Sequence, residues 1–147
     1  MRRLFYSDDF GVRVSLGLLV LRVVMGAALM FHGWPKIQNP MQWMGAEAPV
    51  PGILQACSAV AEFVGGGALI VGLFTRLFAF MLVINMAVAA GMVHISQGDP
   101  FVGKPGERSW ELAAVYFACA LLFLFAGAGK LSLDALLFGP RQGVEDQ

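Results

Sequence analysis

Two opposite charges and one amide stand in sequence that is otherwise apolar. Arg22, Glu62 and Asn85 each lie within a long run of mostly apolar residues, and no other Asp, Glu, Lys or Arg falls in these runs. Ionisable side chains in such surroundings are candidates for proton transfer or ligand binding. We expect Arg22 and Glu62 to face each other, with Asn85 bonded to one of them. The alternative is a purely structural ion pair that fixes the register of the helices.

A second group of side chains that could bind a ligand lies at or near the ends of the apolar runs. Its members are His32, Trp34, Lys36, His94, Glu111 and Tyr116. A quinone head group needs one or two hydrogen-bond donors beside an apolar slot, and histidine, tryptophan and lysine supply donors. We therefore predict a quinone or substrate pocket here. The alternative is simple anchoring, because tryptophan and lysine are common at bilayer boundaries.

Metal and disulfide chemistry have little support. His32 and His94 are the only histidines, and two imidazoles alone are a weak signal for haem. We expect no metal and no intrinsic cofactor. Cys57 and Cys119 are expected to be buried, unpaired thiols, because their predicted depths differ by nearly the full reach of a disulfide. On a regular helix Asn85 and His94 are nine residues apart and point to opposite sides, and we expect Asn85 to face inward.

The elements that position these residues follow from composition. Apolar residues make up 58% of the 147-residue chain and charged residues 14%, against roughly 45–50% and about 25% in soluble domains. Runs of about 20 apolar residues without a polar stripe cross a bilayer as helices. The sequence predicts an all-α integral membrane protein, one domain over residues 1–147. Its four-helix bundle is antiparallel and up-down, followed by a short interfacial helix at 133–138 that Ser132 caps. The predicted spans are about 14–34, 53–74, 77–95 and 111–129.

Charge placement predicts the orientation. Ten positive residues balance ten negative ones, so there is no basic excess for nucleic acid. Lys and Arg outside the spans favour one side by six to three, and such residues gather on the cytoplasmic side. The larger set is Arg2, Arg3, Arg13, Arg76, Lys130 and Arg141, and the smaller is Lys36, Lys104 and Arg108. We expect both termini in the cytoplasm and a multi-pass protein of the inner (plasma) membrane.

The polar residues of the spans fall at one predicted depth. At 1.5 Å per residue, Arg22 and Glu62 lie roughly 13 Å below the outer surface and Asn85 roughly 15 Å below it. All three are near the centre of a core about 30 Å thick. Gly26 and Gly66 lie four residues from the two charges, and small residues let helices approach closely.

The motifs and their order resemble the DoxX family over residues 12–136. They are an Arg in the first run, His-Gly-Trp-Pro-Lys at 32–36, Ala-Glu-Phe-Val-Gly-Gly-Gly at 61–67, Gly-Leu-Phe-Thr-Arg at 72–76, and His94, Glu111 and Tyr116. The closing motif, Gly-Ala-Gly-Lys-Leu-Ser-Leu-Asp at 127–134, departs mildly from the family's Gly-Pro-Gly-Arg-like pattern. The resemblance implies a small inner-membrane four-helix protein. Related DoxD-type proteins belong to a thiosulfate:quinone oxidoreductase.

The expected function is that of an inner-membrane subunit of a quinone-linked redox system, with oxidation of sulfur compounds as one option. The expected partners are membrane lipid, quinone, a redox partner protein and a second copy of the chain. Whether the chain has catalytic activity of its own is left open. Two alternatives are a non-catalytic membrane anchor or assembly factor for a redox partner, and a small transporter with the buried charges at its midplane.

Overall fold

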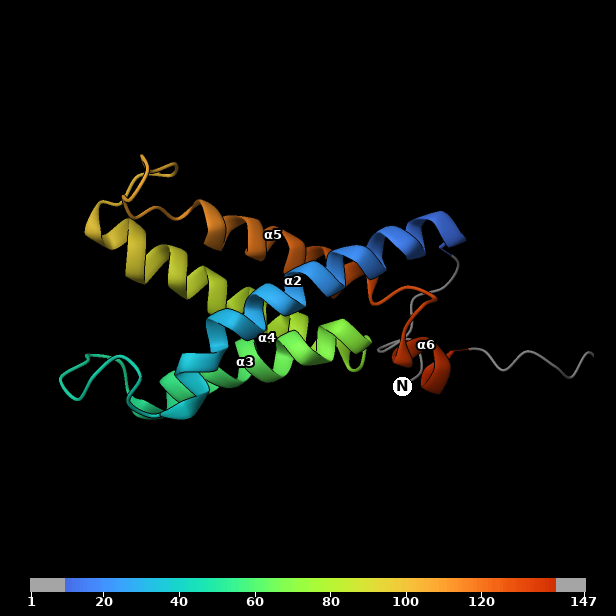
Figure 1. Cartoon of the computed structure of the whole chain (residues 1–147), viewed down its shortest axis with the longest axis horizontal. Coiled ribbons are helices and arrows are strands. Elements are labelled where there is room, and N and C mark those ends of the chain that lie inside the picture. Colours follow the sequence, from blue (N-terminus) through green and yellow to red (C-terminus); the bar gives the residue numbers. More distant parts are fainter. Residues whose placement is uncertain (1–9, 140–147) are drawn as a thin grey trace, which may run out of the picture.

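The computed structural model describes residues 10–139, and this part of the chain contains helices and loops but no strands (Figure 1). The elements are α2 (Val12–Gln38), α3 (Gly52–Val71), α4 (Thr75–Val88), α5 (Glu111–Ala126) and the short α6 (Leu133–Phe138). Arg2, Arg3 and Arg141, which entered the orientation count, lie outside the described residues. The all-helical prediction is confirmed for the described part.

Three helical segments are long and apolar enough to cross a membrane: Val12–Gln38, Gly52–Val71 and Thr75–Gln97. The fourth predicted span is shorter than expected, because α5 holds 16 residues and ends at Ala126. Gly127 ends it by adopting φ 74° and ψ −163°, a conformation that side-chain-bearing residues rarely take. The helix therefore ends three residues before the predicted end of the span at residue 129.

Helix α2 is longer than predicted. The sequence predicts that this span ends at residue 34, before Pro35, but the helix continues through Pro35 to Gln38. A proline removes one backbone hydrogen bond, and membrane helices tolerate this where neighbouring groups satisfy the freed carbonyl. Because of these extra residues, Lys36 belongs to the last turn of the helix and not to a loop.

The span that begins with α4 is irregular in its second half. A π-helix, Ala89–His94, follows Val88, and a 3₁₀ turn, Ile95–Gln97, follows that. The expected half-turn between Asn85 and His94 assumed a regular α-helix throughout. The wider π turn changes the direction in which His94 points.

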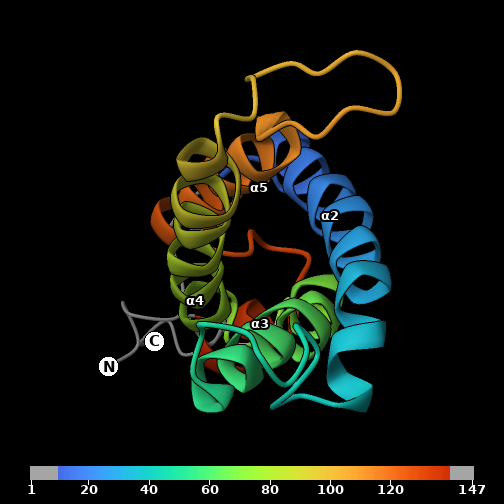
Figure 2. The same ribbon diagram turned by 90° about the vertical axis from the view of Figure 1, so that its left-hand side faces the viewer.

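The long helices pack in chain order, α2 along α3, α3 against α4 and α4 along α5. Figure 2 shows them from the end that carries residues 39–51 and 98–110, called the loop end below. Gly26 and Gly66 bring α2 and α3 into backbone contact, because a Cβ on Gly26 would lie 2.5 Å from the Gly66 carbonyl oxygen. This close approach confirms the role expected of the two glycines.

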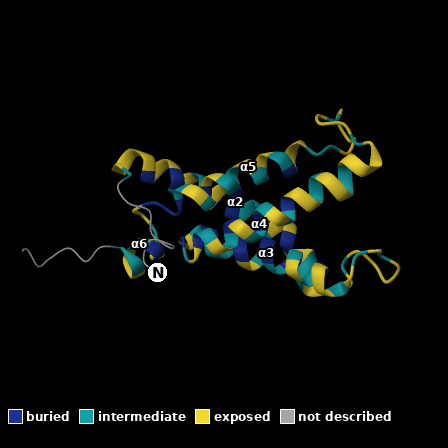
Figure 3. Cartoon of the chain, turned by 180° about the vertical axis from the view of Figure 1, so that it is seen from behind, coloured by how far each residue is buried: buried dark blue, intermediate teal, exposed yellow. Residues whose placement is uncertain are grey.

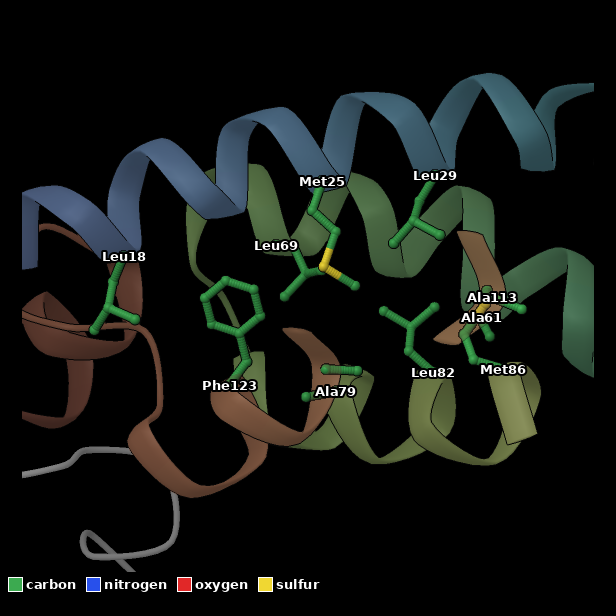
Figure 4. Close-up of a cluster of buried hydrophobic side chains, with 11 residues drawn as sticks. Leu18, Met25, Leu29, Ala61, Leu69, Ala79, Leu82, Met86, Ala113 and Phe123 are labelled. Atoms are coloured by element: carbon green, nitrogen blue, oxygen red, sulfur yellow. The ribbon is translucent and has the colours of Figure 1, made fainter. Parts of the chain in front are cut away.

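The core lies between the four long helices. Met25 and Leu29 of α2, Leu69 of α3, Leu82 of α4 and Phe123 of α5 are at most 2% exposed and point toward one another (Figure 4). Exposed residues run along the outside of the helices (Figure 3). Many of them are large and apolar, such as Phe31, which is 82% exposed, and Phe125, which is 73% exposed. An apolar exterior over span-length helices is what a bilayer requires, so the chain is a membrane protein.

Helices α2 and α5 separate toward the loop end. Helix α2 starts beside the far end of α5 and crosses diagonally to lie over the loop end of α3 (Figures 1 and 2). The opposite end, called the α6 end below, carries the α3–α4 turn and α6 (Figure 1). Lys130 of the connecting segment donates its backbone N–H to the Ser15 hydroxyl at the start of α2, 3.2 Å away.

Candidate functional site

A buried carboxylate joins three helices near the loop end. Glu62 of α3 is 4% exposed. Its Oε1 accepts hydrogen bonds from Lys36 Nζ of α2 at 2.6 Å and from Asn85 Nδ2 of α4 at 2.9 Å. Its Oε2 is buried and has no hydrogen-bond partner. The Asn85–Glu62 contact is as expected, whereas the cation that pairs with Glu62 is Lys36 and not Arg22.

The backbone of α2 allows Lys36 to reach Glu62. Gly33 is buried against α3, and a Cβ there would lie 2.6 Å from the Phe63 backbone nitrogen. Only glycine permits so close an approach of the two helices at this level. Lys36 follows Gly33 by three residues on the same face of α2, and its apolar stem extends toward the carboxylate.

The fourth helix contributes Tyr116. This α5 residue is half-buried and close enough to Glu62 for the two groups to interact electrostatically. Its ring also meets the edge of the His32 ring, with centroids 6.2 Å apart and planes at 73°. Because α2 and α5 diverge toward this end, the His32–Tyr116 contact bridges the two separating helices (Figures 1 and 2). We call His32, Lys36, Glu62, Asn85 and Tyr116 the Glu62 cluster.

A folded loop lies against the aqueous side of this cluster. The Trp43 ring lies 4.6 Å from Lys36 Nζ, a cation–π distance. The Gln55 side chain ties the loop down by accepting from Met44 N at 3.0 Å and donating to Val50 O at 2.9 Å, and Trp43 Nε1 donates to the Gln55 carbonyl at 2.9 Å. Sequence reasoning missed Trp43 and Gln55. A lone glutamine at the start of an apolar run is the signal that could have indicated a loop anchor.

The predicted Arg22–Glu62 pair is wrong. Arg22 is fully buried, and its two terminal nitrogens donate to backbone carbonyls, Leu69 O at 3.2 Å and Leu131 O at 2.5 Å. The depth estimate failed because it counted from residue 31, whereas α2 runs seven residues further to Gln38. Arg22 therefore lies nearer the α6 end than predicted, one turn beyond the Gly26–Gly66 contact.

Arg22 belongs to a second polar cluster at the α6 end. Asp134 is 1% exposed, and its two oxygens accept from Phe74 N at 2.7 Å and Thr75 N at 2.9 Å. These N–H groups stand at the start of α4, where the helix dipole stabilises a negatively charged carboxylate. Asp134 also interacts electrostatically with Arg22, and its own N–H donates to Gly72 O at 2.8 Å. We call Arg22, Gly72, Ser132 and Asp134 the α6 latch.

Ser132 fulfils the capping role that the sequence predicted. Its hydroxyl oxygen accepts a hydrogen bond from Ala135 N at 3.1 Å, and its O–H donates one to Gly129 O at 2.7 Å. The cap starts α6 at the position that places Asp134 under the α3–α4 turn.

Three of the predicted pocket residues lie outside the Glu62 cluster. Trp34 packs on Phe63 with ring centroids 5.6 Å apart and is 56% exposed. Glu111 is exposed in the first turn of α5. His94 Nδ1 lies 2.8 Å from Asp99 Oδ2, which Arg108 Nε also approaches at 3.3 Å. The contacts described for these three residues do not include the Glu62 cluster.

The thiols and histidines are dispersed. Cys57 is exposed on α3 and Cys119 is half-buried on α5, and both are free. Burial was thus wrongly predicted for Cys57, which lies on the outside of its helix. Among residues 10–139 no group of three or more His, Cys, Asp or Glu side chains is placed to hold a metal ion.

Comparison with known proteins identifies relatives that cover most of the chain. The chain is 36% identical over 123 residues to an uncharacterized protein of Haemophilus influenzae, covering 82% of this chain and 90% of that one. It is 27% identical over 133 residues to the "Putative oxidoreductase CatD" of Bacillus subtilis, with 88% and 93% covered. It is also 27% identical over 129 residues to the inner membrane protein YqjF of Escherichia coli, with 84% and 93% covered. No solved structure matches. The family model of DoxX matches residues 17–95, a stretch that includes Arg22, the Gly26–Gly66 contact and the Lys36–Glu62–Asn85 network. The chain therefore belongs to the DoxX family.

Proposed function

We propose that this protein is an inner-membrane component of a quinone-linked redox system and that the Glu62 cluster binds the quinone head group. Membership of the DoxX family supports the proposal, as does similarity to a protein named as an oxidoreductase and to one named as an inner membrane protein. The electron donor is a small sulfur compound or a partner protein, because no redox group is recognised in the chain's own sequence.

The proposed topology has four antiparallel spans with both termini in the cytoplasm. Three helices have the length of a span, and α5 completes the fourth crossing together with residues 127–131. Gly127, Ala128 and Gly129 are buried, so the first part of this non-helical stretch is covered by protein rather than lipid, while Lys130 and Leu131 are exposed. The loop end then faces outward, and the α6 latch faces the cytoplasm.

The observation that carries the proposal is the Glu62 carboxylate with one oxygen satisfied and one unpartnered. A quinone presents carbonyl acceptors and its reduced form presents hydroxyl groups, so a site for both needs donors and an acceptor together. The Glu62 cluster has both, because Lys36, His32 and Tyr116 carry donors and Glu62 Oε2 is an acceptor without a partner.

The surroundings suit a ligand that arrives from the membrane. His32 is exposed on the side where α2 and α5 diverge, and its contact with Tyr116 bridges that side. A flat head group reaches Glu62 from the bilayer when the two rings separate, while its tail remains among apolar side chains. Rotation of side chains on this scale is rapid and does not require the helices to unfold.

The test measures quinone that remains bound to the full-length protein after extraction from its own membrane in a mild detergent. Native mass spectrometry is expected to show a quinone-sized adduct. Lys36→Met removes the charged donor beside Glu62 and is expected to lower the bound quinone at least tenfold. Lys104→Met, a change in the loop at the same end, is the matched control and leaves it unchanged. A wild-type protein that carries a stoichiometric protein partner and no quinone would instead establish the anchor or assembly role.

A further inference from the structure

The unpartnered oxygen of Glu62 specifies what kind of group the ligand must present. Buried polar atoms in folded proteins nearly always have hydrogen-bond partners, so each exception needs an explanation. Glu62 is 4% exposed, yet Oε2 has no partner while Oε1 has two. Both donors bind Oε1, which leaves Oε2 without a partner.

The charge of the carboxyl group follows from its contacts. Lys36 Nζ lies 2.6 Å from Oε1 and forms a salt bridge with it, while Asn85 donates to the same oxygen. A carboxyl group in a salt bridge with a lysine is a charged carboxylate. An ionised carboxylate only accepts hydrogen bonds. The group that completes Oε2 must therefore be a donor.

Tyr116 provides the second half of the recognition. The tyrosine is within electrostatic range of Glu62, but no hydrogen bond joins them among the described contacts. A ligand hydroxyl between them would donate to Glu62 Oε2 and accept from the Tyr116 hydroxyl. A carbonyl oxygen in the same place would face the carboxylate, lone pairs against negative charge, and would be repelled.

We propose that the Glu62 cluster binds the hydroxyl-bearing, reduced form of its ligand in preference to the carbonyl form. This inference rests on the proposed function, under which the reduced form is a hydroquinone and the oxidised form is a quinone. Tighter binding of the reduced form makes the bound quinone a stronger oxidant. Each tenfold preference raises the potential of a two-electron couple by about 30 mV. Such a site is suited to accept electrons from a donor and to reduce quinone.

The experiment compares the affinities of a short-tailed benzoquinone and of the same compound reduced to its hydroquinone. Full-length protein in lipid nanodiscs is equilibrated with each form under anaerobic conditions, and protein-free nanodiscs give the background from partition into lipid. Bound ligand is quantified by chromatography. The wild-type protein is expected to bind the hydroquinone at least tenfold more tightly.

Two variants locate the preference. Glu62→Gln keeps the shape of the side chain but can place an amide N–H where Oε2 was, so the preference is expected to fall below twofold or to reverse. Glu47→Gln changes an exposed acid in the loop at the same end and is expected to keep the wild-type ratio. Tyr116→Phe leaves the Lys36–Glu62 pair intact, and it is expected to weaken hydroquinone binding severalfold.

The outcomes separate this inference from the proposed function. Equal affinities for the two forms, or tighter binding of the quinone by the wild-type protein, would overturn the inference and leave quinone binding in place. Binding of neither form would overturn both. Should Glu62→Gln fail to fold, the wild-type ratio still decides the matter, because it needs no variant.

Discussion

The protein buries ionised groups in two polar clusters and stabilises them in different ways. At the α6 end, the two terminal nitrogens of Arg22 donate to backbone carbonyls and Asp134 accepts from two backbone N–H groups, while Arg22 Nε is buried without a partner. At the loop end, Glu62 depends on the side chains of Lys36 and Asn85 and retains one unpartnered oxygen. Backbone partners are fixed by the fold, whereas side-chain partners can rotate. The first arrangement stabilises structure, and the second leaves capacity to bind.

This difference changes the interpretation of intramembrane charge. By sequence alone Arg22 and Glu62 were equivalent, one buried charge in each of two spans. Their partners show that Arg22 ties the closing motif, through Leu131, to the end of α3. Glu62 of α3 instead accepts hydrogen bonds from side chains of two other helices, α2 and α4. An ionisable residue in a span is thus a functional candidate only after its partners are known.

Exchanging the two charges should have the largest effect. If they formed a pair, Arg22→Glu combined with Glu62→Arg would restore it. Because each contacts different groups, the exchange leaves two buried charges among wrong partners, at about 3–5 kcal/mol each. That sum approaches the whole stability of a typical domain. We expect no folded protein by size-exclusion chromatography in detergent, and a monodisperse, stable double variant would contradict the assignment of partners.

Gly72→Ala should be the most destabilising single change among those in the α6 latch. Gly72 has φ 69°, and a Cβ there would overlap Arg22 Nη1 and lie 2.6 Å from Ser132 Cβ. Left-handed strain of about 1–2 kcal/mol and overpacking of about 1–3 kcal/mol add together. Thermal unfolding in detergent measures the loss. Gly17→Ala is the control, because a Cβ at Gly17 meets no atom within 4 Å and should stabilise α2 by roughly 0.5–1 kcal/mol.

Asp134→Asn should have an intermediate effect confined to the α6 latch. The amide keeps one acceptor but turns an N–H donor toward a backbone N–H of Phe74 or Thr75. Leaving one buried N–H without an acceptor costs about 1–3 kcal/mol. The same thermal unfolding assay applies, and quinone binding per folded molecule should remain at the wild-type level. A selective loss of binding would show that the two clusters are coupled.

His32→Ala should have the smallest effect on stability and a visible effect on binding. The side chain is exposed, and its described contact is with the Tyr116 ring, so stability should change by less than about 0.5 kcal/mol. Removing one donor should weaken quinone binding severalfold in the nanodisc assay. Unchanged quinone affinity would place the head group away from α2 and restrict the site to Glu62 and Tyr116.

Much of the architecture could be predicted from local sequence. Apolar runs located the spans to within a few residues at most ends, and Ser132 marked the start of α6. The errors came from boundaries. Pro35 suggested an end to α2 that neighbouring helices make unnecessary, and that error shifted the estimated depth of Arg22 by about two turns. For the same reason, only half of the predicted pocket residues belong to the Glu62 cluster. Residues near the end of a span are close in sequence, but they can face lipid, loop or core.

The sequence by itself determined that the chain is helical, that it belongs in a membrane, and that its few buried polar groups must find partners. These follow from composition and periodicity, because a bilayer excludes unpaired backbone groups and most charges. Only the tertiary structure decided which partners they find. Lys36 reaches Glu62 because Gly33 lets α2 approach α3, and Arg22 reaches Leu131 because residues 127–131 fold back beneath the helices. Those contacts join residues 26 and 109 positions apart, and local patterns carry no information over such separations.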